Sequence, residues 1–362
     1  MVEPNEHLRT IRRMSERMPE RAGRVHMDMN ERVTPFAPAV LSALLAQIRP
    51  ELLCHYPDAS PLYERLSQQL GFPEEMLYVT PGSDAGIRLL FQAYVRPGDR
   101  VAFPDPTFAM YAVYAQIFQA QARTVRYGRD RALDAGQLQD LLVERPRILA
   151  VASPDQPTGA VMPRETLAAL ASAACDSDTL FLIDEAYYPF YPQTAIELVR
   201  KFENVALLRT FSKVGGLAGL RVGYVVANPR VIDSMSRVRG SFEVNTIAIA
   251  MACHLLDHPS IAREYLQEVE RGREVLREMA QALGLGFPAC PANFQLLQFR
   301  GLGSTAELSA ELAARGYLVK GGFSAPCVSD CIRVTLAGPE LMRRFWGDCD
   351  DVLRRFAAGG DR

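Results

Sequence analysis

The stretch Arg209-Thr-Phe-Ser-Lys-Val-Gly-Gly-Leu-Ala-Gly-Leu-Arg-Val-Gly-Tyr224 follows a short apolar run at residues 205–208 and is crowded with glycine. Such a run is typical of a buried strand, and a lysine just beyond it, Lys213, is poorly solvated. Desolvation and neighbouring cations lower the pKa of an amine, which makes it nucleophilic near neutral pH. A lone loop lysine is more often a solvated surface charge, so this interpretation depends on the surrounding chain.

Around this stretch, short apolar runs alternate with longer amphipathic segments. The runs that we interpret as strands are residues 76–79, 100–103, 148–152, 180–183, 205–208 and 222–226. The segments with helical spacing of apolar residues are 84–94, 107–118, 133–142 and 164–174. This alternation predicts an α/β fold with a mostly parallel central sheet flanked by helices. In such a sheet, ligands bind outside the carboxyl ends of the strands.

The pattern changes after about residue 245. A long helix at 262–283 is followed by short strands near 294–299, 318–320 and 331–335. A chain of 362 residues exceeds the usual size of a single core. We therefore predict a large domain at 30–245 and a smaller α+β domain formed by residues 246–362 together with the N-terminal segment 1–29.

The composition excludes several partners. Lys and Arg number 40 against 42 Asp and Glu, with no basic excess that would favour nucleic acid. The arginine-rich residues 9–24 also contain Glu16 and Glu20, and we interpret them as a solvated helix face.

Seven scattered cysteines without a CxxC pair indicate free thiols and no metal site. Because no run reaches the ~20 apolar residues of a membrane span and the N-terminus lacks a signal pattern, we expect a cytoplasmic protein.

Two segments offer donors for a phosphate. Thr210, Ser212 and Arg221 supply two hydroxyls and a guanidinium. The turn Thr80-Pro-Gly82-Ser83-Asp84 stands between a predicted strand and a predicted helix, an arrangement in which backbone N–H groups and the helix dipole bind anions. Taken alone, this turn would more often be an ordinary helix cap.

The run Thr179-Leu-Phe-Leu-Ile-Asp-Glu-Ala-Tyr-Tyr188 places two carboxylates at the carboxyl end of a buried strand. A buried carboxylate needs a cationic partner. For Asp184 one candidate is a pyridinium nitrogen, whose proton an ionised carboxylate holds in place so that the ring acts as an electron sink. The alternative is an aspartate that caps the following turn.

These segments resemble the class I/II, fold-type I aminotransferases that depend on pyridoxal 5'-phosphate, and within them the histidinol-phosphate aminotransferase branch. The resemblance extends from about Asn30 to about Phe345, and its most specific element is Ser-Lys, seven residues, then Arg at 212–221. Further motifs that carry it are Tyr56-Pro-Asp58, Pro106-Thr-Phe108, Pro157-Thr-Gly159 and Cys331-Ile-Arg-Val-Thr335.

The resemblance implies a role for each cofactor residue. Lys213 carries the cofactor as a Schiff base and acts as the general base, and Asp184 pairs with the pyridine nitrogen. Tyr187 hydrogen-bonds the phenolic oxygen, and Phe108 stacks on the ring. The positions that bind the phosphate, together with Gly82 of the same turn, are Ser83, Asp84, Thr210, Ser212 and Arg221.

Other positions bear on the assembly and the substrate. Tyr56 matches a residue that reaches the phosphate of the neighbouring subunit, which implies a homodimer with shared active sites. Arg333 matches the arginine that binds a substrate carboxylate or phosphate, and Asn30 matches an asparagine in the segment that covers the substrate.

Two positions depart from the family pattern. Gln156 stands where the family usually has the asparagine that hydrogen-bonds the phenolic oxygen, so its amide is one methylene further from the backbone. Lys320 stands where many histidinol-phosphate enzymes have arginine, and a lysine offers a point charge in place of a bidentate fork. Lys320 is therefore either a substrate contact with altered specificity or a solvated charge at a strand end.

The resemblance implies that the enzyme moves an amino group between an amino donor, by family habit glutamate, and a small oxo substrate. One fold and one cofactor serve several chemistries. The alternative is a lyase such as a threonine-phosphate-type decarboxylase, which shares the same lysine, aspartate and phosphate cup. A non-catalytic regulator would need an appended DNA-binding domain, for which we find no pattern.

Overall fold

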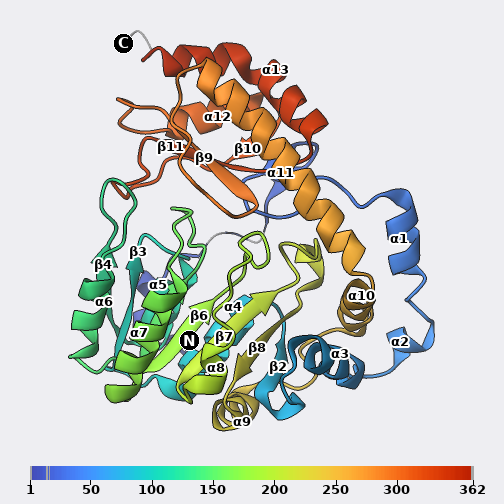
Figure 1. The fold of residues 1–362 in the computed structure, drawn as a ribbon, viewed down its shortest axis with the longest axis vertical. Coiled ribbons are helices and arrows are strands. Elements are labelled where there is room, and N and C mark those ends of the chain that lie inside the picture. Colours follow the sequence, from blue (N-terminus) through green and yellow to red (C-terminus); the bar gives the residue numbers. More distant parts are fainter. Residues whose placement is uncertain (1, 14, 16, 360–362) are drawn as a thin grey trace.

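The computed structural model describes residues 2–13, 15 and 17–359, and a seven-stranded sheet forms the centre of its larger part (Figure 1). The strands lie in the order β2 (Leu77–Thr80), β8 (Gly223–Ala227), β7 (Val205–Thr210), β6 (Leu180–Asp184), β5 (Ile148–Ala152), β3 (Arg100–Asp105) and β4 (Gln121–Arg126). Only β8 runs antiparallel to its neighbours β2 and β7. The predicted mostly parallel sheet is confirmed.

Strand β4 was not predicted. It pairs with β3 at the edge of the sheet, where most of its side chains are exposed and only Val125 is buried. An edge strand needs few apolar residues, so its sequence lacks the apolar run by which the other six strands are identified.

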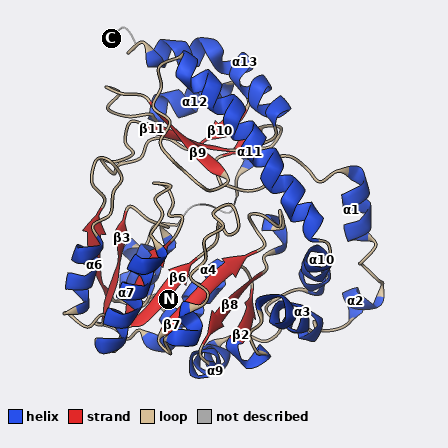
Figure 2. Ribbon diagram, in the orientation of Figure 1, coloured by secondary structure: helices blue, strands red, loops and turns tan. Residues whose placement is uncertain are grey.

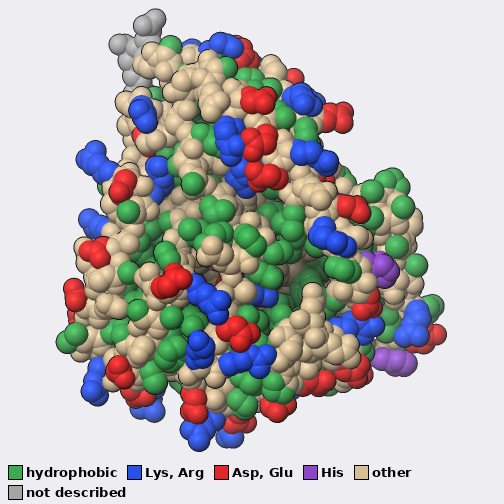
Figure 3. All heavy atoms as spheres, viewed as in Figure 1, with side chains coloured by type: hydrophobic (Ala, Val, Ile, Leu, Met, Phe, Trp, Pro, Cys, Tyr) green, Lys and Arg blue, Asp and Glu red, His purple; other side chains and the backbone are tan. Residues whose placement is uncertain are grey.

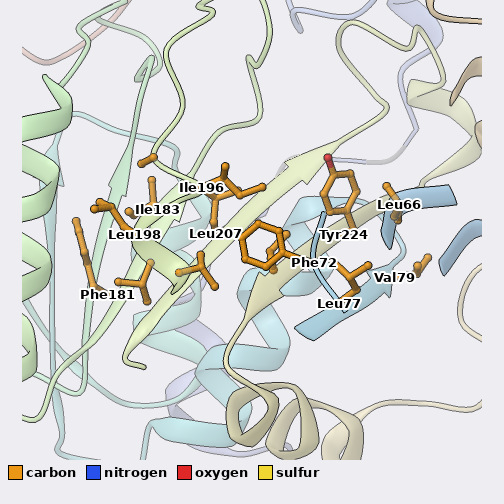
Figure 4. Packing of buried hydrophobic residues seen from close by; sticks show 14 of the residues in the cluster. Leu66, Phe72, Leu77, Val79, Phe181, Ile183, Ile196, Leu198, Leu207 and Tyr224 are labelled. Carbon is orange, nitrogen blue, oxygen red and sulfur yellow. The ribbon is translucent and has the colours of Figure 1, made fainter. Parts of the chain in front are cut away.

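Helices cover both faces of this sheet (Figure 2). On one face lie α4 (Ser83–Tyr94), α5 (Met110–Ile117) and α9 (Pro229–Val238). The other face is covered by α3 (Ser60–Leu70), α6 (Ala135–Leu142), α7 (Arg164–Asp176), α8 (Leu198–Lys201) and α10 (Thr246–Asp257). Figure 4 shows how Phe181, Leu207 and Phe72 belong to the continuous apolar layer on this second face. Strands buried on both faces position their carboxyl ends rigidly, and these ends carry the chemistry described below.

A second, smaller group of elements lies above the sheet in Figure 1. Its helices are α11 (Pro259–Ala282), α12 (Ala306–Ala314) and α13 (Pro339–Ala357). They pack over two small sheets: β9 (Phe294–Gln298) with β11 (Cys331–Thr335), antiparallel, and β1 (Val25–Met27) with β10 (Tyr317–Val319), parallel. Helix α10, in contrast, packs on α3 beside the large sheet. The domain limits at 29/30 and 245/246 stay a prediction.

The N-terminal part of the chain contributes short elements. They are η1 (Glu6–Thr10), η2 (Pro19–Arg21), α1 (Pro38–Leu45) and α2 (Glu51–Cys54), followed later by the 3-10 turns η3 (Glu74–Met76) and η4 (Ala218–Leu220). The expected helix over residues 9–24 was wrong: in the part of this segment that is described only the two 3-10 turns form, and residues 14 and 16 lie outside the described residues. Arg21 is buried because it pairs with Asp28 and Glu31.

The surface charge is mixed. On the face shown in Figure 3, Lys and Arg side chains are interspersed with Asp and Glu side chains. Within the described residues, no helix combines the length and apolar character needed to cross a membrane.

Candidate active site

The carboxyl ends of the central strands and the N-terminus of α4 enclose one cavity with an empty volume of about 610 Å³. Ten of the residues predicted to hold the cofactor line it: Ser83, Asp84, Phe108, Gln156, Asp184, Tyr187, Thr210, Ser212, Lys213 and Arg221. They come from loops after different strands, so the sheet brings together residues that are up to 138 positions apart in the chain. This is the position at which ligands bind in open α/β sheets.

Lys213 lies three residues beyond β7 and is half-buried. Its Nζ donates hydrogen bonds to the carbonyl oxygens of Asn30 at 2.9 Å and Met29 at 3.2 Å. Burial and, second, the positive charge of Arg333 together lower the pKa of Lys213 to about 8. A substantial fraction of the amine is therefore neutral near physiological pH, as a nucleophile or a base requires.

Asp184 ends β6 and turns its carboxylate into the same cavity. Oδ1 accepts a hydrogen bond from the Ala186 N–H at 2.9 Å, and Oδ2 accepts one from the Tyr111 hydroxyl at 3.1 Å. Burial raises the pKa of Asp184 to about 6, while these two hydrogen bonds oppose the shift. A cationic ring nitrogen beside it would offset the cost of burying the ionised carboxylate. The contact with Tyr111 was not predicted from the sequence.

One end of the cavity is rich in hydrogen-bond donors. The Arg221 Nη1 donates to the Ser212 Oγ at 3.2 Å, and the Thr210 hydroxyl lies 3.0 Å from the same oxygen. Gly82 has a φ of 81° and precedes the first turn of α4, whose N–H groups have no partner within the helix. A Cβ at Gly82 would lie 2.6 Å from the Arg221 Nη2. The close approach thus requires glycine and leaves a cradle for an anion.

Asp84 lies at the same end, where a free carboxylate would repel an anion. Its Oδ1 instead accepts a hydrogen bond from the Tyr114 hydroxyl at 3.0 Å. We therefore assign its contribution to the backbone N–H at the start of α4.

Asn30, Tyr187 and Gln156 form a cluster of polar side chains, in which Tyr187 and Gln156 line the cavity and Asn30 does not. The Asn30 Nδ2 donates to the Tyr187 hydroxyl oxygen at 2.7 Å and lies 3.4 Å from the Gln156 Oε1, which is 3.5 Å from the Tyr187 hydroxyl. Burial raises the pKa of Tyr187 to about 12, so its hydroxyl stays protonated at neutral pH and acts as a donor. Phe108 packs edge-on against Tyr111, with its ring in the cavity wall.

The two predicted substrate cations differ in burial. Arg333 is buried, and its Nη2 donates to the Asp28 carbonyl oxygen at 2.5 Å, but its Nε is buried without a hydrogen-bond partner. Lys320 is exposed and does not line the cavity. The two residues form a β-bridge through both backbone hydrogen bonds, so their side chains leave the strands on the same face.

Tyr56 lies outside this cavity. Its side chain is 80% exposed and stacks on Phe242, with ring centroids 4.5 Å apart. The structure therefore does not bring Tyr56 to the cofactor residues of its own chain.

Two buried groups beside the cavity, Arg209 as the partner of Glu185 and the acid Asp155, were not predicted from the sequence. The Arg209 guanidinium forms an ion pair with Glu185 at 2.8 Å behind the strand ends that carry Thr210 and Asp184. Asp155, one residue before Gln156, accepts hydrogen bonds from neighbouring loops. Asp155 lies three residues beyond the buried strand β5, so the reasoning applied to Asp184 could have identified it. Within the described residues, no three side chains of the His, Cys, Asp or Glu type come together as a metal site.

Comparison with known proteins agrees with the motifs and the geometry. Residues 32–344 match the family "Aminotransferase class I and II". The chain is 30% identical over 321 residues to a histidinol-phosphate aminotransferase of Thermoanaerobacter pseudethanolicus, covering 88% of this chain and 90% of that protein. It is 33% identical over 323 residues to the Symbiobacterium thermophilum protein of the same name, covering 88% of each.

Solved structures share the fold. Histidinol-phosphate aminotransferase from Sinorhizobium meliloti, in complex with pyridoxal-5'-phosphate, superposes with a TM-score of 0.87 at 23% identity and covers 98% of each chain. An aspartate aminotransferase variant from Thermus thermophilus gives a TM-score of 0.79 at 21% identity, covering 97% of this chain and 100% of that one. The predicted fold-type I architecture is confirmed. Together with the family match over residues 32–344, these findings show that the chain belongs to the class I and II aminotransferases.

Proposed function

We propose that this aminotransferase carries pyridoxal 5'-phosphate on Lys213 and moves an amino group from glutamate to a small oxo substrate. The observation that carries the proposal is the arrangement of this cavity: an amine whose pKa is lowered to about 8, a buried carboxylate facing the same space, and an anion cradle at one end. These groups match the aldehyde, the ring nitrogen and the phosphate of the cofactor.

The residues fit this cofactor in detail. Arg221 and the hydroxyls of Thr210 and Ser212 present donors to a phosphate, and Gly82 leaves space beside them. Asp184 has no cationic hydrogen-bond partner of its own: its donors are a tyrosine hydroxyl and a backbone N–H. When bound, pyridoxal 5'-phosphate supplies an electron sink for the negative charge left at the substrate's α-carbon.

The chain's own groups perform the remaining tasks. With the cofactor bound, Asp184 would hold a proton on the ring nitrogen, and Tyr187 and Gln156 present hydrogen-bonding groups to the same cavity. The amine of Lys213, once free, removes the proton from the substrate's α-carbon as a general base. Arg333, whose Nε lacks a partner, binds an anionic group of the substrate and fixes the orientation of that carbon.

Lys213→Ala tests the proposal. Wild-type protein loaded with pyridoxal 5'-phosphate should show a visible absorption band and release stoichiometric 2-oxoglutarate when mixed with glutamate. The variant should lose both while retaining weak cofactor binding, because the phosphate cradle and Asp184 remain. A variant with the wild-type band and full turnover would show that another residue anchors the cofactor. Release of carbon dioxide by wild-type protein without an oxo acid product would favour the lyase.

We further propose a homodimer in which Tyr56 serves the neighbouring subunit. Tyr56 and Phe242 form an exposed aromatic pair, and the nearby helices α1 and α2 expose Leu41, Leu45 and Leu53. Apolar surface of this kind is typical of an interface between subunits. Mixing the inactive variants Tyr56→Ala and Lys213→Ala should restore partial activity, because a hybrid dimer retains one intact composite site. A fully active monomer at assay concentration would refute this assembly.

A further inference from the structure

Asp155 is a buried acid that the proposed function does not use. It follows β5, is 0% exposed and does not line the cavity. Its Oδ1 accepts hydrogen bonds from the Thr107 hydroxyl and the Gln156 N–H, both at 2.7 Å, and its Oδ2 accepts one from the Tyr127 hydroxyl at 2.7 Å. All three donors are uncharged. A buried carboxylate that is held by neutral donors alone is costly to the fold.

These donors come from the loops that follow three adjacent strands. Strands β5, β3 and β4 are neighbours in the sheet. Thr107 lies two residues beyond β3, Tyr127 directly follows β4, and Asp155 and Gln156 follow β5. The backbone around Asp155 is also fixed, because its N–H donates to the Ala160 carbonyl oxygen at 2.7 Å and its carbonyl oxygen accepts from the Gly159 N–H at 2.9 Å.

Two of these loops reach the cavity through the next residue in the chain. Thr107 precedes Phe108, and Asp155 precedes Gln156; Phe108 and Gln156 both line the cavity. The Asp155 carboxylate therefore connects the backbone that carries the aromatic wall to the backbone that carries the amide. Tyr127 adds a link to the smaller part of the molecule, because it packs in the apolar cluster that contains Cys327 and Phe294.

The charge state of Asp155 is consistent with this arrangement. Burial raises the pKa of Asp155 to about 7, and the three hydrogen bonds oppose that shift. The other titratable groups that face it are Tyr127, Asp184, Tyr111, Tyr187 and Cys327. None of these is a cation, so the hydroxyls and the N–H are the groups that stabilise the ionised form.

We propose that Asp155 is a positioning residue, whose carboxylate clamps the loops after β3, β4 and β5 and thereby fixes Phe108 and Gln156 relative to each other around the cofactor ring. This inference rests on the placement of pyridoxal 5'-phosphate in the cavity proposed above. Asp155 acts only through these neighbours, so its loss should change how tightly and in which orientation the cofactor is held.

The test uses the loaded enzyme and four single variants. Asp155→Asn keeps the shape and removes the charge, Tyr127→Phe and Thr107→Val each delete one donor, and Tyr317→Phe is the matched control. Tyr317 likewise donates its hydroxyl to an aspartate, Asp348, but lies on β10 away from the cavity. Three quantities are measured: the dissociation constant of pyridoxal 5'-phosphate, the visible circular dichroism of the bound cofactor and the thermal unfolding midpoint.

Asp155→Asn should weaken cofactor binding about tenfold or more, and each donor variant by roughly threefold, as expected for loss of one buried hydrogen bond. Visible circular dichroism should change in all three. The double variant Asp155→Asn/Tyr127→Phe should bind no more weakly than Asp155→Asn alone, because both substitutions disrupt the same clamp. Tyr317→Phe should lower the unfolding midpoint without altering the dissociation constant or the dichroism.

The inference would be overturned if Asp155→Asn and Tyr127→Phe both bound the cofactor with an affinity within about twofold of wild type and both showed unchanged dichroism. If Asp155→Asn does not fold, Tyr127→Phe and Thr107→Val decide by the same criteria. A wild-type protein that forms no visible band with pyridoxal 5'-phosphate would instead overturn the proposed function, and this inference with it. A normal wild-type band together with unaffected variants overturns the clamp alone.

Discussion

The two sides of the proposed active site are built in different ways. At the end proposed for the phosphate, the donors come from two short stretches, 82–84 and 210–221, which lie at the carboxyl ends of β2 and β7 in the same sheet. On the side proposed for the substrate, Asn30 and Arg333 are held in place because the N-terminal segment lies against β11: the Asn30 N–H donates to the Thr335 Oγ1, and Arg333 donates to the Asp28 carbonyl oxygen. Local backbone geometry therefore forms the first end, and long-range packing forms the second.

Arg333→Ala should have the largest effect on the substrate end. Loss of a buried, charge-assisted contact should cost on the order of 2 to 4 kcal/mol in transition-state stabilisation. In the proposed reaction, glutamate and the second substrate bind the same pocket in turn, so both half-reactions should slow. Single-turnover rates for each half-reaction measure this, with the dissociation constant of pyridoxal 5'-phosphate as an internal control that should stay near the wild-type value. A normal glutamate rate would contradict the shared pocket.

The amine of Lys213 should react at lower pH than the other lysines of the cofactor-free protein. Its pKa is lowered to about 8 from an ordinary 10.5, and only the neutral amine is nucleophilic, so labelling should rise with pH through a midpoint near pH 8. Near pH 7.5 the neutral fraction should exceed that of an ordinary lysine on the order of 100-fold. The chain has just two other lysines, Lys201 and Lys320, both exposed.

Peptide mass spectrometry after brief treatment with an amine-selective acylating reagent would compare all three lysines within one sample. Equal pH profiles for Lys213 and the two exposed residues would contradict the perturbed amine.

Arg221→Ala should affect the phosphate end alone. Loss of its hydrogen bonds to a charged phosphate should weaken cofactor binding by about 1.5 to 3 kcal/mol, while turnover at saturating cofactor changes little. Equilibrium titration with pyridoxal 5'-phosphate, together with kcat at saturation, separates the two effects. Arg333→Ala is the control, because in that variant turnover should fall while cofactor affinity stays near the wild-type value. A variant with wild-type cofactor affinity would remove Arg221 from the phosphate site.

Lys320→Ala should have the smallest effect. Its side chain is exposed but leaves the strand on the same face as Arg333, so it can contact a distal anion of the second substrate only through solvent-screened interactions worth about 0 to 1 kcal/mol. The KM for an anionic acceptor should rise several-fold with the glutamate half-reaction unchanged. An unchanged KM for every acceptor tested would identify Lys320 as a solvated charge at the strand end.

The contrast between the two ends also explains what could be predicted from the sequence. The strands β5, β6 and β7 have apolar runs, and polar residues that follow such runs must gather at one edge of the sheet, so Asp184 and the segment 210–221 were identified with their neighbours. Asp155 could have been predicted by the same argument, because it lies in the loop after β5. In contrast, the Asp28 carbonyl that binds Arg333, and the stacking of Tyr56 on Phe242, depend on tertiary packing that no local pattern encodes.

The central claim is that this cavity binds pyridoxal 5'-phosphate covalently through Lys213. Borohydride reduction of the loaded protein, followed by digestion and mass spectrometry, tests it most directly, because the chain contains three lysines and the two alternatives lie outside the cavity. We expect the reduced cofactor on Lys213, with none on Lys201 or Lys320. A cofactor adduct on either of those two residues, or none at Lys213 in a protein with a visible cofactor band, would contradict the account.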